Sequence, residues 1–185
     1  MAHTLTLKQI EPVTHNTYRL VFARPQSFEF TPGQATDMSL DREGWRDEYR
    51  PFTMTSQPED EDLEYVIKTY PEHEGVTNEI ATLTPGENVF VGQPWGAIRD
   101  IGPGTFIAGG AGVTPFIPIL RRRDRDGTLA ASHLVFGNKS EDDIILRPLG
   151  DVLVILPAPA MADEDIELLC QRAAARTTQV VTALV

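Results

Sequence analysis

The sequence contains a single cysteine and no long apolar run among its 185 residues. That cysteine, Cys170, excludes an internal disulfide and a metal or iron–sulfur site built from several thiolates. No segment approaches the roughly 18 consecutive apolar residues that a membrane-spanning helix needs. Residues 1–6 lack a basic segment followed by an apolar one, so we expect no secretory signal. These absences favour a cytoplasmic protein.

Basic residues are scarce as well, because 16 lysines and arginines face 27 aspartates and glutamates, for a net charge of −11. Such an acidic surface repels phosphate backbones and anionic lipids, which disfavours nucleic-acid and membrane partners. Residues 1–102 hold 8 basic and 17 acidic side chains, whereas 103–185 hold 8 and 10. This step in charge suggests two units. No metal site is predicted, because the histidines lack the spacing of metal ligands. They are His3, His15, His73 and His133.

The first half has the pattern of β-strands. Apolar side chains alternate with polar ones in short runs that begin near Leu5, Tyr18, Thr36, Leu63 and Val89, with turn signals between them. Such a series predicts an antiparallel sandwich or barrel. Residues 75–83 have helical spacing instead, so we expect one short helix there.

The second half changes its period to alternating strands and helices. A buried strand at 105–108 leads through a glycine turn into a helix, with Thr114 as its N-cap and Pro115 at its first position. Further strands are predicted at 132–136, 152–156 and 179–185, and an amphipathic helix at 163–176. This alternation predicts a parallel α/β sheet, with a domain boundary near 102–104.

Two segments of the first half have residue types that bind anionic or aromatic ligands. Residues 50–56 (RPFTMTS) offer a cation, a flat ring and a hydroxyl close together on a strand. The alternative is an ordinary strand with a surface arginine. Residues 66–70 (VIKTY) precede a helix start at 75–77 (GVT), where free amides and a hydroxyl can hold an anion. A plain helix cap is the alternative there.

Two segments of the second half have similar potential. Residues 109–115 (GGAGVTP) run from strand to turn to helix, so a diphosphate could approach the backbone at the helix N-terminus. A tight turn without a ligand remains possible, because the glycine spacing is not that of the dinucleotide fingerprint. Residues 135–139 (VFGNK) end a strand with Asn138 and Lys139, which could meet an adenosine ribose or its phosphate. A solvated loop lysine is the alternative.

The order of these four segments resembles the ferredoxin–NADP reductase superfamily, which includes flavodoxin reductases, flavin domains of oxygenase reductases and cytochrome b5 reductase. The resemblance extends from residue 5 to 146 and includes the turn Pro32-Gly33-Gln34. It implies a six-stranded Greek-key antiparallel β-barrel that binds FAD over 1–102. A compact α/β parallel-sheet domain that binds NAD(P) would follow over 103–185.

The resemblance implies roles for individual residues of the barrel. Arg50 would neutralise the FAD pyrophosphate, and Phe52, where the family usually has tyrosine, would lie against the isoalloxazine ring. Thr53 would orient flavin N5, the hydride acceptor, and is the predicted catalytic residue. The other expected contacts are Pro51, the ribityl-lining Val66, Ile67 and Lys68, and the pyrophosphate-binding amides of Gly75, Val76 and Thr77.

In the second domain the resemblance implies that the turn and helix start bind the diphosphate of a pyridine nucleotide. The residues concerned are Gly110, Ala111, Gly112, Thr114 and Pro115, and Ala111 replaces a threonine often found beside the nicotinamide. Beyond Leu146 the sequence departs from the family. If Met161 matches the family methionine, Leu156 replaces a cysteine and Pro157 a glycine, and no aromatic residue ends the chain. About 30 residues, or one strand–helix unit, are missing from the pattern.

Three hypotheses follow. The first is a flavin-dependent oxidoreductase that passes a hydride from NAD(P)H to FAD and then electrons to an acceptor such as ferredoxin, flavodoxin or an oxygenase component. The second is a flavin-binding electron-transfer or sensing module with little NAD(P)H turnover. The third is an interaction protein without flavin.

The partner and the nucleotide are less determined. A basic cluster could dock an acidic electron carrier, or it could simply be a solvated helix end. Its members are Arg121, Arg122, Arg123 and Arg125. Lys139 could reach the 2′-phosphate of NADPH, although the acidic residues at 141–143 would oppose it. On this reading the sequence leans slightly to NADPH over NADH.

Overall fold

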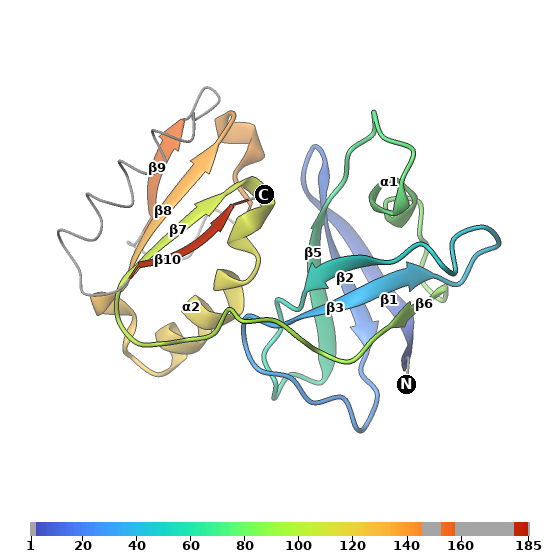
Figure 1. Cartoon of the computed structure of the whole chain (residues 1–185), viewed down its shortest axis with the longest axis horizontal. Coiled ribbons are helices and arrows are strands. Elements are labelled where there is room, and N and C mark those ends of the chain that lie inside the picture. Colours follow the sequence, from blue (N-terminus) through green and yellow to red (C-terminus); the bar gives the residue numbers. More distant parts are fainter. Residues whose placement is uncertain (1–2, 146–152, 158–179, 185) are drawn as a thin grey trace. The chain divides into compact units, whose positions relative to one another are not determined.

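The computed structural model describes residues 3–145, 153–157 and 180–184 of the chain. They divide into two compact units, 1–99 and 100–185. The first unit contains antiparallel strands and one short helix, and the second contains a parallel sheet with helices (Figure 1).

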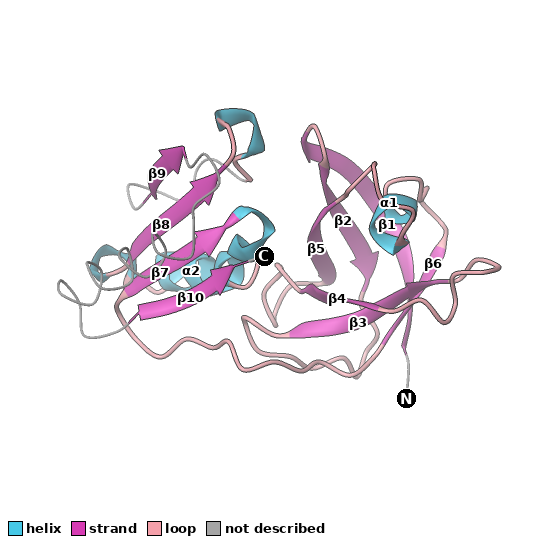
Figure 2. Cartoon of the chain, turned by 45° about the horizontal axis from the view of Figure 1, so that its top comes forward, coloured by secondary structure: helices cyan, strands magenta, loops and turns pink. Residues whose placement is uncertain are grey.

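The first unit is a six-stranded sheet in the order β4-β3-β6-β1-β2-β5 (Figure 2, magenta). Its strands are β1 (His3–Thr14), β2 (Thr17–Ala23), β3 (Ala35–Leu40), β4 (Arg50–Thr53), β5 (Asp62–Lys68) and β6 (Asn88–Val91). All neighbours are antiparallel. Because β6 is the last strand of the unit in the chain and yet lies between β3 and β1 in the sheet, the order is a Greek key.

The edges of this sheet meet without a continuous ladder. An isolated bridge joins Met54 to Tyr65, and the Thr55 N–H donates to the Glu64 carbonyl at 2.7 Å. The sheet is therefore barrel-like but not closed. The predicted six-stranded Greek-key fold is confirmed with this qualification.

Alternate apolar side chains of the strands form the core of the sheet. Leu63, Tyr65 and Ile67 of β5 point into one apolar cluster with Leu5 and Leu7 of β1. The Tyr65 hydroxyl lies 3.1 Å from Thr36 Oγ1 inside that core, and burial raises the pKa of Tyr65 well above its usual value. The opposite face of β5 is thus left for Glu64, Val66 and Lys68.

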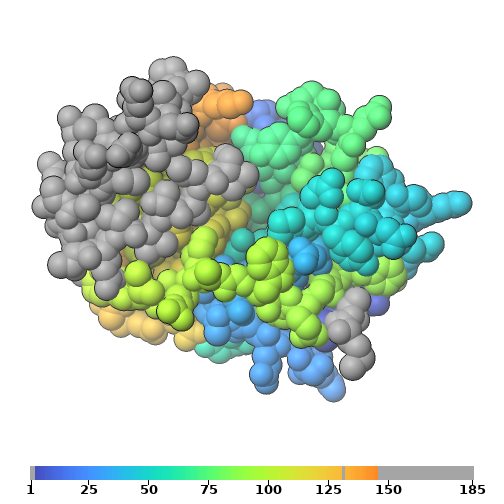
Figure 3. All heavy atoms as spheres, in the orientation of Figure 1, coloured from blue at the N-terminus to red at the C-terminus, as the bar shows by residue number. Residues whose placement is uncertain are grey.

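Local turn chemistry sets the ends of the strands. Gly33 has a φ of 98°, a left-handed conformation that favours glycine, and the Gln34 N–H closes the turn on the Thr31 carbonyl at 3.1 Å. The short helix α1 (Val76–Ile80) begins after Gly75 and buries Val76 and Ile80, as its spacing predicted. The loop of residues 41–49 between β3 and β4 lies at the surface of the unit (Figure 3, cyan).

The second unit contains four parallel strands in the order β10-β7-β8-β9. They are β7 (Thr105–Gly109), β8 (His133–Asn138), β9 (Leu153–Pro157) and β10 (Val180–Leu184), with helix α2 (Phe116–Arg125) after β7. The predicted parallel α/β sheet is therefore confirmed. The helix expected over 163–176 lies outside the described residues. Within the described part of the chain, no helix is both long and apolar enough to cross a membrane.

The start of α2 differs from the prediction. The glycine turn forms a short 3-10 helix, η1 (Gly110–Val113), and Pro115 occupies the cap position of α2. The Thr114 hydroxyl donates back to the Ala111 carbonyl at 3.0 Å and does not cap α2. Because Thr114 N–H also bonds to that carbonyl, the threonine closes the turn instead of starting the next helix.

Candidate functional site

Strand β4 presents an arginine that is only loosely held. The side chain of Arg50 is 52% exposed, donates to the neighbouring Tyr49 carbonyl at 2.7 Å, and lies 3.8 Å from the Glu48 carboxylate. An exposed ion pair of this length contributes little to stability. The Arg50 guanidinium can therefore turn toward an anionic ligand at low cost.

The rest of β4 follows the register with β3. Phe52 lies opposite Thr36 and packs against the core while remaining half-buried. Thr53 lies opposite Ala35 and is half-buried, whereas Pro51, opposite Asp37, is exposed. A partly exposed ring next to a partly exposed hydroxyl is the combination predicted for this segment.

Strand β5 divides the three predicted ribityl-lining residues between its two faces. Ile67 is 1% exposed and belongs to the core cluster, so its side chain cannot line a ligand site. Only its backbone is available there. Val66 and Lys68 lie on the other face, where Val66 is 4% exposed and Lys68 is half-buried. Strand alternation separates the three residues that the sequence prediction had grouped.

A polar network that the sequence analysis missed lies on that same outer face. Glu64 accepts a hydrogen bond from Thr55 Oγ1 at 2.8 Å and another from Arg19 Nε at 2.6 Å. Arg19 also donates to Glu11 at 2.8 Å, and the Ser56 hydroxyl accepts from the Glu64 N–H at 3.0 Å. The network fastens the end of β4 to β5 across the open seam. The sequence gives no signal for this network, because alternation puts Glu64 on the outer face and its burial, with 8% exposed, appears only in the structure.

The start of α1 has the open backbone expected of an anion site. The φ of Gly75 is −153°, which any residue adopts, and an added Cβ would meet nothing within 4 Å. The fold of the described residues therefore does not require glycine at this position. Thr77 is half-buried beside it. Space above the backbone is what a ligand approaching the amides of residues 75–77 would need.

The glycine turn after β7 is similarly open at its first residue. Gly110 has a φ of 47°, and an added Cβ there would meet no atom within 4 Å. Gly112, Thr114 and Pro115 are buried, while Ala111 is half-buried. Because the Thr114 hydroxyl proton is used within the turn, a ligand would meet the backbone of residues 109–111 first.

The end of β8 contains a buried amide without a partner. Asn138 is 5% exposed, and neither its Nδ2 nor its Oδ1 has a hydrogen-bond partner among the residues that the structure describes. Unpaired buried amides are rare, and one in a native structure calls for an explanation. Lys139 follows and is exposed, and the Ser140 hydroxyl donates to Asp143 Oδ2 at 2.8 Å. A polar group of a ligand would satisfy Asn138.

The predicted basic docking cluster is partly wrong, because Arg123 is buried. Its side chain is 4% exposed, its Nη1 donates to Ser132 Oγ at 2.7 Å, and its Nε donates to Asp100 Oδ2 at 2.9 Å. Its guanidinium also lies over the Phe106 ring, 5.5 Å from the centroid. Arg121 and Arg122 are half-buried and Arg125 is exposed, so they retain access to the surface.

Asp100 is held in its charged form by this arginine. Burial pushes the pKa of Asp100 upward, but hydrogen bonds from Arg123 and from the Gly102 N–H outweigh it and lower the pKa below its ordinary value. Arg123 therefore ties the first residues of the second unit to the last turn of α2.

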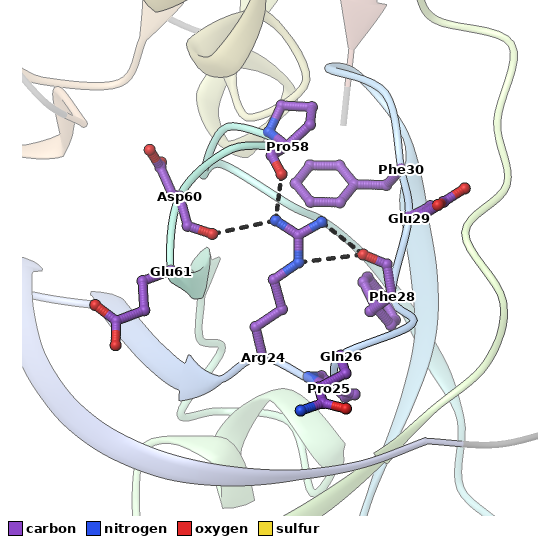
Figure 4. A pocket seen from close by; sticks show the side chains of 9 residues that line it. All are labelled: Arg24, Pro25, Gln26, Phe28, Glu29, Phe30, Pro58, Asp60 and Glu61. Carbon is purple, nitrogen blue, oxygen red and sulfur yellow. Dashed lines mark hydrogen bonds between the residues drawn. The ribbon is translucent and has the colours of Figure 1, made fainter.

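A cavity of about 620 Å³ in the first unit involves none of the predicted site residues. Figure 4 shows Arg24 at its centre, stacked near Phe30 and bonded to the carbonyls of Phe28, Pro58 and Asp60. Because this guanidinium donates hydrogen bonds to main-chain carbonyls of two loops, it holds those loops together and is not a free cation.

Trp95 is an exposed aromatic residue of the first unit that the sequence analysis did not identify. It is 48% exposed, and it exchanges two main-chain hydrogen bonds with Ala35, at 2.8 and 2.9 Å. Thr53 pairs with the other side of Ala35, so the backbones of Trp95 and Thr53 are about 10 Å apart, or two strand spacings. An exposed aromatic between Pro94 and Gly96 was the available signal.

The described residues thus fit a flavin and a nucleotide at separate places in the two units. An exposed arginine, a half-exposed ring and an open backbone suit an anionic aromatic ligand in the first. In the second, an open turn and an orphaned amide mark the carboxyl ends of neighbouring parallel strands, where α/β sheets bind ligands. Within residues 3–145, 153–157 and 180–184, no cluster of histidine, cysteine or carboxylate side chains could hold a metal ion.

Two family models match the chain. Residues 4–99 match the oxidoreductase FAD-binding domain, and residues 106–154 match the oxidoreductase NAD-binding domain.

Curated relatives match about three quarters of the chain. The reductase component (ferredoxin–NAD(P)(+)) of naphthalene 1,2-dioxygenase/salicylate 5-hydroxylase systems from Ralstonia sp is 29% identical over 75% of this chain and 42% of its own length. NADH-cytochrome b5 reductase 1 from Aspergillus terreus is 32% identical over 76% of this chain and 52% of its own length. The chain therefore spans about half the length of the curated relatives it matches.

Solved structures share the fold. The cytochrome b5 reductase domain of Ulva prolifera nitrate reductase aligns with a TM-score of 0.75 at 21% identity, covering 100% of this chain and 87% of that one. A ferredoxin NADP+ reductase from Neisseria gonorrhoeae, with bound FAD and NADP, aligns with a TM-score of 0.72 at 14% identity, covering 99% of this chain and 83% of that one.

Proposed function

This chain belongs to the ferredoxin–NADP reductase superfamily, within the family of oxidoreductase FAD-binding domains, and from that membership we propose that it is a flavin-dependent NAD(P)H oxidoreductase. In this proposal residues 1–102 bind FAD and residues 103–185 bind the pyridine nucleotide. The chain would take a hydride from NAD(P)H and deliver electrons to a protein or small-molecule acceptor.

One observation carries the proposal: both cofactor-binding units are present in one chain and in this order. The FAD-binding match covers the barrel-like sheet, and the NAD-binding match covers β7, α2, β8 and the first residues of β9. A flavin domain alone would support a binding module, whereas the pairing supports hydride transfer between two bound cofactors.

The bound flavin supplies the redox chemistry, since it accepts a hydride and releases electrons singly. The protein contributes position and charge. The exposed Arg50 guanidinium would pair with the FAD pyrophosphate, and the amides of residues 75–77 would donate to the same group. Phe52 would offer its free face to the ring system, and the Thr53 hydroxyl would donate a hydrogen bond near N5.

The second unit would bind the nucleotide along the carboxyl ends of β7 and β8. The open backbone at Gly110 would admit the diphosphate, and Asn138 would pair with a polar group of the adenosine half. Thr114 would act indirectly, because its hydroxyl fixes the turn through the Ala111 carbonyl. These assignments rest on open backbone, burial and unsatisfied polar atoms in the described structure.

An electron acceptor is part of the proposal. The relatives named above belong to dioxygenase systems or are cytochrome b5 reductases, which supports a protein acceptor. Arg121, Arg122 and Arg125 remain the proposed docking residues, since Arg123 is buried. We propose a cytoplasmic location as well, because a chain with a single cysteine needs no internal disulfide and is therefore compatible with a reducing compartment.

Steady-state turnover tests the function. The full chain, reconstituted with FAD and freed of unbound flavin, should oxidise NADH or NADPH with ferricyanide as acceptor, and the rate should scale with bound FAD. Protein that stays colourless after reconstitution would refute the proposal. A yellow protein without turnover would instead support the binding-module alternative.

A further inference from the structure

A row of charged and polar side chains crosses the outer face of the first unit from β1 to the end of β4. Arg19 of β2 donates to Glu11 of β1 at 2.8 Å and to Glu64 of β5 at 2.6 Å. Glu64 also accepts from the Thr55 hydroxyl at 2.8 Å. Since β1 pairs with β2 and β2 pairs with β5 in continuous ladders, this row bonds the Thr55 side chain to the regular part of the sheet.

The carboxylate in the middle of this row is buried. Glu64 is 8% exposed, and the threonine that it accepts from, Thr55, is 0% exposed. A buried carboxylate is costly unless it is paired and hydrogen-bonded, as this one is. Buried polar groups that are bonded in this way hold one arrangement of the segments that they join. The two side chains are therefore fixed relative to each other.

This bond lies at the seam of the barrel-like sheet, where β4 meets β5. Strand β4 is four residues long, and its regular ladder is with β3. Toward β5 there is an isolated bridge from Met54 to Tyr65, and the Thr55 N–H donates to the Glu64 carbonyl at 2.7 Å. The side-chain bond from Thr55 to Glu64 adds a second tie at the same position. It thereby limits how far the end of β4 can move from β5.

The register carries this constraint to Thr53. The bridged residues Met54 and Tyr65 both belong to the core. Because side chains alternate in a strand, Thr53 and Thr55 lie on the outer face, one residue to either side of Met54. Thr53 is half-buried there and lies opposite Ala35 of β3. The Thr53 hydroxyl is thus placed by β3 on one side and by the carboxylate bond two residues later.

We propose that Glu64 is a positioning residue for hydride transfer, held by Arg19 and acting on Thr53 through Thr55. The inference rests on the proposed function, in which the Thr53 hydroxyl donates a hydrogen bond near flavin N5. A group that is misplaced by about 1 Å can slow a reaction on the order of 100-fold. The tie to Glu64 keeps a short edge strand from shifting by such an amount.

Amide exchange in the apoprotein tests the constraint without a cofactor. Thr55→Val keeps the shape of the side chain and removes its donor, so the amides of residues 54 and 55 should exchange at least about tenfold faster. The ladder between β1 and β2 should keep its rates. Thr55→Ser retains the hydroxyl and should restore slow exchange. Thr84→Val is the matched control, because the Thr84 hydroxyl also donates to a glutamate, Glu87, at 2.8 Å.

Two results of this experiment would overturn the constraint. One is unchanged exchange at residues 54 and 55 in Thr55→Val. The other is a rise of the same size in every amide of the first unit, because that would show a general loss of stability and no local release of β4.

Flavin bleaching in the full FAD-loaded chain tests whether the constraint acts through Thr53. Under saturating NADH or NADPH, Thr55→Val should slow bleaching about tenfold and change the FAD affinity by less than about twofold. Glu64→Gln keeps an acceptor without the charge and should slow it about threefold. In a Thr53→Ala background, Thr55→Val should slow bleaching no further, because the hydroxyl to be positioned is absent.

The outcomes separate the positioning role from the proposed function. Equal slowing by Thr55→Val with and without the Thr53 hydroxyl would overturn the positioning role alone. Bleaching of Thr55→Val at the original rate, or a loss of FAD affinity by the same factor as the rate, would do so too. If neither nucleotide bleaches the original FAD-loaded chain, the proposed function itself is wrong and the positioning role falls with it.

Discussion

Two arginine-bearing regions, the start of β4 and the last turn of α2, make opposite use of the same side chain. Arg50 is 52% exposed, donates to its neighbour's carbonyl and lies 3.8 Å from the Glu48 carboxylate. Arg123 is 4% exposed and bonds to Asp100 and Ser132 over the Phe106 ring. A guanidinium is available to a ligand only when the protein has not already satisfied its donors. By that measure Arg123 is a structural residue, whereas Arg50 is open to the ligand that we propose for it.

Removing Arg123 should give the largest effect on folding. Arg123→Ala removes the guanidinium that binds Asp100 and Ser132 and leaves Asp100 with the Gly102 N–H, so it should lower the free energy of unfolding of the second unit by about 2–4 kcal/mol. The estimate is below that for a fully buried pair because the Asp100 side chain is 37% exposed. Urea unfolding followed by circular dichroism measures it. Arg125→Ala, on the exposed side of the same helix end, should cost no more than about 0.5 kcal/mol, and equal losses in the two variants would break the comparison.

Removing Arg50 should affect the cofactor and leave the fold unchanged. Arg50→Ala deletes a charge-assisted contact to the pyrophosphate and should weaken FAD binding by about 10- to 100-fold. Fluorescence titration of the apoprotein with FAD measures the affinity. Arg46→Ala, at an exposed arginine of the loop that precedes β4, provides the matched control. A loss of stability in Arg50→Ala, without a loss of FAD affinity, would reverse the roles of the two arginines.

Acid should reveal the ion pair of Arg123 and not that of Arg50. The pKa of Asp100 lies below its ordinary value of 3.8 in the folded protein. A carboxyl with a lowered folded pKa stabilises the protein above its unfolded pKa, and the contribution disappears as the pH falls through the folded value. Below about pH 4, the free energy of unfolding of the second unit should therefore fall more steeply in the original protein than in the Asp100→Asn variant. Thermal unfolding measured against pH for both proteins tests this. Equal pH dependence in the two proteins would show that the ion pair contributes nothing.

The remaining arginines of α2 should give the smallest effect. Reversing Arg121, Arg122 and Arg125 to glutamate should slow electron delivery to an acidic protein acceptor by about fivefold, because steering by charge is lost. Reduction of ferricyanide should be unaffected, since it needs no docking surface. Equal slowing of both reactions would show that these arginines do not dock the acceptor.

The sequence predicted the strands and the fold of both units because alternation and turn residues report burial directly. Leu63, Tyr65 and Ile67 were expected on one face, and they form part of one core. The same alternation could have warned that Ile67 would not share a ligand-binding face with Val66 and Lys68. Grouping them as one segment overlooked the two-residue period of a strand.

Hydrogen bonds and ion pairs between residues far apart in the chain could not be predicted from the sequence. Nothing in a run of four arginines within five residues tells which one meets Asp100, more than 20 positions earlier. The bond between Thr114 and Ala111 and the network of Thr55, Glu64 and Arg19 likewise depend on backbone geometry. Asn138 was predicted from its place at a strand end, but its unsatisfied amide needed the burial of the folded chain.

Anaerobic mixing of the FAD-loaded chain with NADH, followed at the flavin absorption band, tests the central claim most directly. The account predicts bleaching in a single exponential whose rate saturates with NADH, because the nucleotide binds before the hydride moves. A flavin that stays oxidised under excess NADH and excess NADPH would contradict it.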